Sequence, residues 1–354
     1  MTWPARLLAT ASVLLGLGLG LARADGAARV DVPIQQIVLP NGDMRYSVPV
    51  TVGGGPPVEA ALDTGSFGLR VLASALSPSQ YEATEESRNY PFSGGARLRG
   101  VLAKATIGVG GATTAGPILF QLVNGVDCVE RQPHCPASRV SQADYRIAGD
   151  GIAGQGFPAI VGVSMRRATG VQESADNPLG TIGDGRWIVI LPRPGSTAPG
   201  HLIINPTADD TAGFTSIQLD PLSAGGDGGA ASGWRDGALP GCLVNQASKE
   251  RLCGLTMLDS GAQGFFSHSS DVTKPTTWRA GTPARFELKL GSETMTIPFS
   301  VDRGWPTRVH VLPLRGGNGE ARLSAGTLPF FSYAVLYDAK AGTMGFKARA
   351  AEEP

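Results

Sequence analysis

Neither sign of charge is in excess in this chain of 354 residues, where 30 basic residues balance 30 acidic ones and no basic cluster stands out. We therefore expect no nucleic-acid partner. Metal-binding residues are also few. Of the four histidines only His134 lies between cysteines, and neither cysteine pair has the two-residue gap of a zinc knuckle. No metal and no other cofactor is expected.

Several catalytic motifs are missing as well. The chain has no Gly-x-Ser-x-Gly elbow of a serine hydrolase, no His-Glu-x-x-His of a zinc protease and no phosphate-binding P-loop. These absences argue against the enzyme classes that depend on those motifs.

The four cysteines fall in two close pairs, Cys128 with Cys135 and Cys242 with Cys253. In an exported protein such spacing indicates two local disulfides, although four cysteines allow three pairings.

Residues 1–24 have the features of a signal peptide. Arg6 provides a basic start, Leu7–Leu21 are apolar, and Ala22–Ala24 have the small-x-small pattern that signal peptidase cleaves. The apolar run is too short to span a membrane, so we expect no stable membrane anchor. The sequence thus predicts export to the periplasm or the outside of the cell.

Glycine and proline are abundant, with 49 and 26 residues, and long periodic runs are few, which indicates an all-β fold. The residues after the signal peptide are too many for one small core, so we expect two lobes. We place the N-terminal lobe at 25–205 and the C-terminal lobe at 206–354.

Alternating apolar residues predict strands and hairpins, and clusters of glycine and proline predict loops. The expected strands are Tyr46–Val52 and Val58–Leu62, the expected hairpins are Ala96–Gly111 and Arg285–Phe299, and the expected loops are Pro192–Gly200 and Ser223–Ala238.

The chain also contains an internal repeat. The segment LDTGSFGL, Leu62–Leu69, matches LDSGAQGF, Leu258–Phe265, with four identical positions and three conservative replacements. Both copies follow apolar runs. Their aspartates, Asp63 and Asp259, lie in different halves of the chain, as expected for two copies of one lobe.

A single Asp-Thr-Gly after a strand could be an ordinary turn, because aspartate side chains bond nearby backbone groups. Two such aspartates about 3 Å apart would instead share one proton, since both cannot ionise comfortably. The ionised carboxylate can then take a proton from water while the neutral one donates to a carbonyl oxygen. The pair could therefore hydrolyse an amide.

Residues beside the two aspartates suit this arrangement. The hydroxyls of Thr64 and Ser260 could bond across the junction between the two copies. Ser66 could donate a hydrogen bond to Asp63, whereas its counterpart Ala262 cannot do so for Asp259.

With these motifs the chain resembles the pepsin-like aspartic proteases over nearly all of its mature length. Within that family it looks closer to a bacterial secreted branch than to gastric or lysosomal enzymes. The resemblance includes the two motifs and the position of Cys242 and Cys253. It also includes three further segments: Asp150–Pro158, the C-terminal Ser324–Ala348, and Phe92–Gly111 in the place of the flap hairpin.

The resemblance implies two β-rich lobes with a substrate cleft between them, each lobe providing one catalytic aspartate. Gly154 and Gly326 would lie in the turns that cross behind the catalytic loops. The implied dyad is Asp63 and Asp259, and the implied support residues are Thr64, Gly65, Ser66, Ser260 and Gly261.

The sequence departs from the family beside the flap. The family has a tryptophan seven residues after the first aspartate, where this chain has Arg70. An ungapped match places Ser93 or Gly94 at the flap tyrosine, so Tyr90 and Phe92 are the candidates for that role. The short segment between Asp25 and Asp63 leaves no room for an inhibitory propeptide.

The sequence therefore predicts an exported aspartic endopeptidase that acts as a monomer on peptide or protein substrates. The alternative is a catalytically weak or silent protein of the same fold that binds peptide or glycan in its cleft. Arg70, Ala262 and the altered flap favour this alternative. Retention of both aspartates with their hydroxyls and glycines favours the enzyme, because a silent cleft does not need two carboxylates that repel each other.

Overall fold

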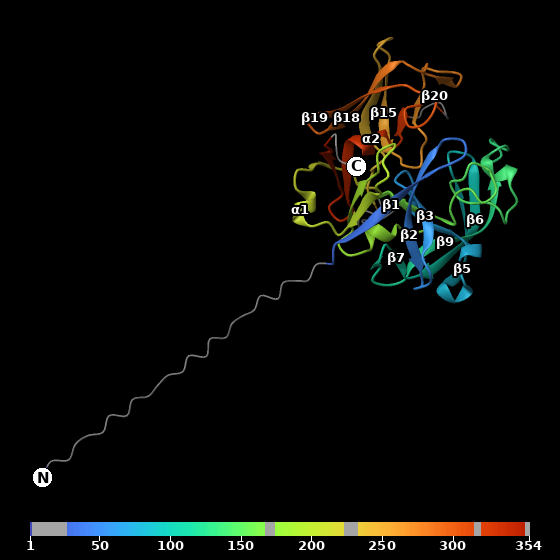
Figure 1. Ribbon diagram of the computed structural model, residues 1–354, viewed down its shortest axis with the longest axis vertical. Coiled ribbons are helices and arrows are strands. Elements are labelled where there is room, and N and C mark those ends of the chain that lie inside the picture. Colours follow the sequence, from blue (N-terminus) through green and yellow to red (C-terminus); the bar gives the residue numbers. More distant parts are fainter. Residues whose placement is uncertain (2–26, 167–173, 223–232, 315–319, 351–354) are drawn as a thin grey trace.

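The computed structural model describes Met1 and residues 27–166, 174–222, 233–314 and 320–350. The expected signal peptide, 1–24, lies almost entirely outside these residues, as does most of the expected loop 223–238. The described chain forms one sheet of 15 strands and one of eight, which lie in two lobes. The two lobes are visible in Figure 1, the N-terminal one in blue and green and the C-terminal one in orange.

The N-terminal lobe is built from alternating apolar strands. In the strand Met44–Val52 the side chains of Tyr46, Val48, Val50 and Val52 are at most 1% exposed, which confirms the predicted alternation. The strands of this lobe are β2 Met44–Val52, β3 Val58–Asp63, β4 Phe67–Leu72, β5 Glu82–Pro91, β6 Ala96–Ala105, β7 Ile107–Val109, β8 Ala112–Thr113, β9 Ile118–Cys128 and β10 Ala159–Val163.

The C-terminal lobe contains the sheet of eight strands. The predicted hairpin at Arg285–Phe299 is confirmed, with Gly291 at a φ of 61° in its turn. The strands are β14 Leu239–Asn245, β15 Arg251–Leu258, β16 Phe265–Ser269, β17 Thr276–Thr277, β18 Pro283–Leu290, β19 Glu293–Ser300, β20 Val309–Pro313 and β21 Arg322–Ala325.

A third group of strands joins the two halves of the chain. The order β13-β23-β22-β11-β12-β1 places the C-terminal β22 beside β11, and β1 continues into the N-terminal lobe by pairing with β2. These strands are β1 Val30–Val38, β11 Arg186–Ile190, β12 Gly200–Ile204, β13 Thr215–Gln218, β22 Tyr333–Asp338 and β23 Thr343–Ala348.

Helices are short. In the described parts of the chain the α-helices are α1 Ala208–Thr211 and α2 Leu328–Ser332, and the 3-10 helices are η1 Ala73–Ala75, η2 Pro78–Gln80, η3 Pro136–Arg139 and η4 Pro178–Gly180. Among the described residues we find no helix with the length and apolar character to cross a membrane.

The internal repeat of the sequence corresponds to a repeated strand arrangement. In the N-terminal lobe β3 runs parallel to β10, β10 antiparallel to β4, and β4 parallel to β9. In the C-terminal lobe β15, β21, β16 and β20 are related in the same way. Each motif therefore lies at the end of a central strand, and the two lobes present their aspartates in equivalent positions.

Both predicted disulfides are present. Cys128 is bonded to Cys135, and Cys242 on β14 is bonded to Cys253, its register partner on β15.

The hairpin predicted at Ala96–Gly111 is wrong. Its first half, β6, pairs with β5 and β9, whereas Ile107–Val109 pairs with β2 and β8 in another part of the same sheet, where its side chains are buried.

Candidate active site

Asp63 is the last residue of β3 and is only 6% exposed. The chain turns immediately afterwards, and the turn directs two donors at the carboxylate. The backbone N–H of Gly65 donates to Oδ1 at 2.8 Å, and the hydroxyl of Ser66 donates to Oδ2 at 2.6 Å. Asp63 therefore sits in a buried turn that orients both of its oxygens.

Asp259 follows β15 and is partly exposed. The N–H of Gly261 donates to its Oδ1 at 3.0 Å. Ala262 offers no hydroxyl, as the sequence indicates, but Ser324 on β21 donates to Oδ2 at 3.2 Å. The second carboxylate thus has a hydroxyl donor from a different element. Sequence comparison of the two motifs misses it, because Ser324 is distant from Asp259 in the chain.

Thr64 and Ser260 join the two turns through four reciprocal hydrogen bonds. The hydroxyl of Thr64 accepts from the N–H of Ser260 at 2.9 Å and donates to the carbonyl of Leu258 at 2.9 Å. The hydroxyl of Ser260 accepts from the N–H of Thr64 at 3.0 Å and donates to the carbonyl of Leu62 at 2.8 Å. All of these groups are buried, so the two turns are held as one unit.

The glycines of the motifs allow the two carboxylates to approach each other. A Cβ on Gly65 would lie 2.3 Å from Cγ of Asp259. A Cβ on Gly261 would lie 3.0 Å from Oδ1 of Asp63 and 3.2 Å from Oδ1 of Asp259. The two carboxylate oxygens therefore flank the same small space, which only a residue without a side chain leaves free.

This proximity affects ionisation. Burial and then the negative charge of Asp63 raise the pKa of Asp259 to about 7, although Ser324, Gly261 and Arg166 act in the opposite direction. Asp259 therefore keeps its proton to a higher pH than an ordinary aspartate does.

The raised pKa of Asp259 predicts a pH-dependent stability. Both the folded and the unfolded chain carry a neutral Asp259 below about pH 4, but between about pH 4 and pH 7 the unfolded chain ionises first, so this group destabilises the fold increasingly. We expect Asp259→Asn to raise the Tm by several °C at pH 7.5 and to leave it unchanged at pH 3.5. Thermal unfolding at both pH values measures this, and an equal difference at the two pH values would contradict it.

Ser324 provides a second prediction. Ser324→Ala removes a donor that favours ionised Asp259, so the loss of activity on the alkaline side should move up by about half to one pH unit. The measurement is kcat/KM against pH. The matched control is Ser66→Ala, which removes the donor to Asp63 and should leave the alkaline limb in place. An unchanged alkaline limb in Ser324→Ala would contradict the assignment.

A partly buried ion pair contacts the first turn. Arg166 donates to the carbonyl of Gly65 at 2.6 Å and forms a salt bridge of 3.2 Å with Asp236. Asp236 also accepts from the Ser164 hydroxyl and the Met165 N–H, and burial raises its pKa. No motif in the sequence points to this pair, because the two residues lie in unrelated segments.

The strands that cross behind the turns hold glycines in equivalent places. Gly326 follows β21, and a Cβ there would lie 2.6 Å from the carbonyl oxygen of Gly264. This close approach to the loop after Asp259 agrees with the expected place of Gly326 in the turn behind that loop. The expectation for Gly154 is wrong, because no atom of the described residues lies within 4 Å of a Cβ at that position. Gly162 on β10 takes this place, paired with Asp63 and with a would-be Cβ 2.6 Å from the N atom of Phe67.

Tyr90 lies on β5 and meets Arg70 on β4. The guanidinium carbon of Arg70 is 3.4 Å from the centre of the Tyr90 ring, within the range of a cation–π contact. Arg70 is 2% exposed and donates to the carbonyls of Phe67 and Gly68 at 2.8 and 3.1 Å. Phe92 packs edge-on against Tyr90, with ring centres 5.0 Å apart.

Burial and nearby charges shift the pKa values of both Arg70 and Tyr90. Burial lowers the pKa of Arg70 and raises that of Tyr90, and the two groups partly offset these shifts for each other. The carboxylates of Asp63 and Asp259 further raise the pKa of Tyr90. Of the two flap candidates, Tyr90 is thus the one in electrostatic contact with the dyad.

The flap candidates belong to a hairpin that begins earlier than expected. It comprises β5 and β6 with a turn at Phe92–Gly95, so the expected location, Phe92–Gly111, includes only its second strand. β9 pairs with β6 along its whole length, from Ala96 to Ala105. The long pairing with β9 removes the free edge that β6 would otherwise have.

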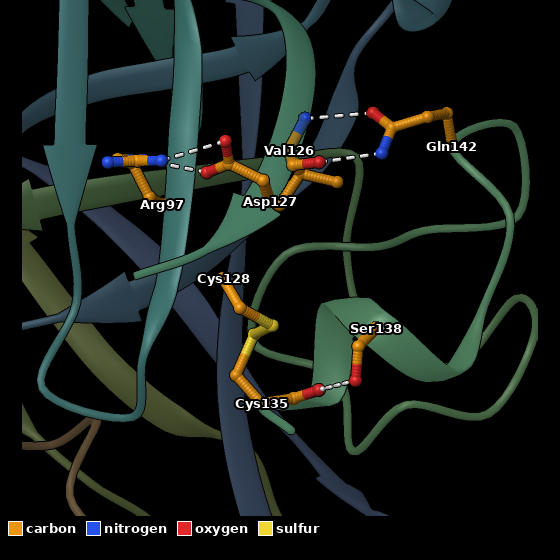
Figure 2. The surroundings of a disulfide bond; sticks show 7 residues. All are labelled: Arg97, Val126, Asp127, Cys128, Cys135, Ser138 and Gln142. Carbon is orange, nitrogen blue, oxygen red and sulfur yellow. Dashed lines mark hydrogen bonds and ion pairs between the residues drawn. A yellow bond between two sulfur atoms is a disulfide. The ribbon is translucent and has the colours of Figure 1, made fainter. Parts of the chain in front are cut away.

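The Cys128–Cys135 loop supports the tip of this hairpin. A Cβ on Gly95 would lie 2.8 Å from the side chain of Gln132 and 3.1 Å from that of Cys135. Figure 2 shows the disulfide linking the end of β9 to the residues before η3, with Arg97 of β6 paired to Asp127 of β9 beside it. The tip is therefore fixed against a cross-linked loop.

A solved structure is similar to this chain in fold over most of its length. The aspartic proteinase from Irpex lacteus, a crystal structure, superposes with a TM-score of 0.54, covering 91% of this chain and 98% of that one at 16% sequence identity. The fold is that of the pepsin-like aspartic proteinases. The all-β, bilobal pepsin-like fold expected from the sequence is thereby confirmed. Neither a protein-family model nor a curated protein matches the sequence.

Proposed function

We propose that this pepsin-like chain is an aspartic endopeptidase in which water is activated between Asp63 and Asp259. In this mechanism Asp259 holds the proton, and Asp63 is the carboxylate that takes a proton from the water. Neutral Asp259 donates its proton to the carbonyl oxygen of the peptide bond. The water oxygen adds to the carbonyl carbon and gives a geminal diol. Asp63 then passes its proton to the nitrogen and the C–N bond breaks, while Asp259 recovers a proton from a hydroxyl of the diol as the carboxylic acid forms.

The observation that carries this proposal is the joined pair of turns. Two buried hydrogen bonds join Thr64 and Ser260, and two more run from their hydroxyls to the carbonyls of Leu258 and Leu62. Together they hold the two carboxylates around one small space. Burial together with the charge of Asp63 keeps a proton on Asp259. Such an arrangement provides one acid and one base at the same place.

The alternative, a silent protein that binds peptide or glycan, is favoured by Arg70 at the position of the family tryptophan. The contact of Arg70 with Tyr90 weakens that argument, because the arginine packs against the flap candidate as an aromatic residue could. Ser324 weakens the argument from Ala262 in the same way.

We further propose an exported protein, periplasmic or extracellular, that works as a monomer on peptide or protein substrates and belongs to a bacterial secreted branch. Two disulfides fit an oxidising compartment.

Incubation of the purified protein with a diverse peptide pool from pH 3 to pH 8 tests the activity. We expect internal peptide bonds to be cleaved, and a statine-type transition-state mimic to abolish the cleavage. Cleavage that persists with this inhibitor, or a complete absence of cleavage, would contradict the proposal.

A further inference from the structure

The turn between β1 and β2 crosses from the N-terminal lobe to the C-terminal lobe beside Asp259. Gln263, four residues after Asp259, makes two hydrogen bonds with the backbone of Met44 at the start of β2. Its Oε1 accepts from the Met44 N–H at 3.2 Å, and its Nε2 donates to the Met44 carbonyl at 3.0 Å. Gln263 is 8% exposed and Met44 7%, so the contact is buried.

An ion pair strengthens the same crossing. Arg308 lies 3.2 Å from Asp43, the neighbour of Met44, and the carbonyl of Arg308 accepts from the N–H of Phe265 at 2.7 Å. Arg308 is therefore attached to the loop that holds Gln263. In Figure 1 the blue turn between β1 and β2 reaches the orange lobe near β20, the strand that follows Arg308.

The two copies of the motif differ at this position. Phe67 corresponds to Gln263, and Phe67 stays within its own lobe, with its ring 6.1 Å from that of Tyr90. Gln263 instead reaches the other lobe. Gly261 is exposed whereas Gln263 is buried and bonded to Met44, so the Asp259 turn is open at Gly261 and covered two residues later.

We propose that Gln263–Met44 and Arg308–Asp43 form a bar across the cleft, which limits substrates to a short peptide segment on that side of the scissile bond. An extended peptide advances about 3.3 Å per residue and needs partners for its backbone groups. The polar groups of Met44 and Gln263 already satisfy one another. This inference rests on the proposed function for its substrate class, a peptide.

Binding of statine-containing peptides tests the bar without requiring turnover. Two series, one lengthened toward the N-terminus and one toward the C-terminus, are titrated into the wild-type protein and into Gln263→Ala/Arg308→Ala by calorimetry. In the wild type we expect one series to weaken at least about tenfold beyond a short length, while the other does not. In the double variant the weakened series should recover to within about threefold of its short members.

The control is Gln218→Ala, which removes an amide that donates to the carbonyl of Gly342 at 2.9 Å and should keep the wild-type asymmetry. Three results would overturn the bar: equal length tolerance of both series in the wild type, an asymmetry that survives in the double variant, or no binding by any member of either series. Asymmetric binding without peptide cleavage would support the bar and contradict the proposed hydrolysis.

Discussion

Asp63→Asn and Asp259→Asn are each expected to lower kcat/KM for peptide cleavage by about 10³- to 10⁴-fold. The first change removes the base that takes the proton from water, and the second removes the acid that protonates the substrate carbonyl. Both variants should fold, because asparagine keeps the shape of aspartate and an oxygen for the N–H of Gly65 or Gly261. Kinetics at the optimal pH, together with circular dichroism, measure both effects.

The control for this experiment is Asp210→Asn, a carboxylate of α1 that pairs with Arg29 at 2.8 Å outside the site. The Arg29 hydrogen bond lowers the pKa of Asp210 to about 2, so its loss should reduce stability at neutral pH while kcat/KM stays unchanged. If either dyad variant cleaved peptide at the wild-type rate, the proposed mechanism would be wrong.

The paired aspartates could be predicted from the sequence because the same constraint acts twice. Each copy needs a buried strand, a carboxylate, a hydroxyl and a glycine in consecutive positions, and this order is local in the chain. The structure shows why each is needed: a Cβ on Gly65 would overlap Asp259, and Thr64 and Ser260 complete one another's hydrogen bonds.

Residues that reach the site through tertiary packing could not be predicted in this way. Ser324 comes from the strand that crosses behind Asp259, and Gln263 meets Met44 more than 200 positions away in sequence. The error at Gly154 has a related cause. Its segment resembles a glycine-rich turn, but strand pairing, which the sequence does not reveal, selects Gly162.

Arg70→Met is expected to lower the Tm clearly and to reduce kcat/KM by about tenfold or more, chiefly through a higher KM. Methionine fills the space but cannot donate to the carbonyls of Phe67 and Gly68, and a hydrogen bond from a charged group contributes about 1.5–3 kcal/mol. It also removes the cation over Tyr90, so the Tyr90 ring is held less firmly near the dyad. Thermal unfolding and steady-state kinetics measure these changes.

A double-mutant cycle of Arg70→Met with Tyr90→Leu separates the contact itself from the general loss of packing. Because the guanidinium is buried and lies 3.4 Å from the ring centre, we expect a coupling free energy of about 1–2 kcal/mol in the unfolding measurements. The matched control is Lys347→Met with Phe214→Leu, whose charge lies 5.9 Å from the ring centre at a more exposed site. That pair should couple by less than about 0.5 kcal/mol. Equal coupling in the two cycles would show that Arg70 supports the flap only as an element of the core, and the proposed role of its charge in holding Tyr90 would then be wrong.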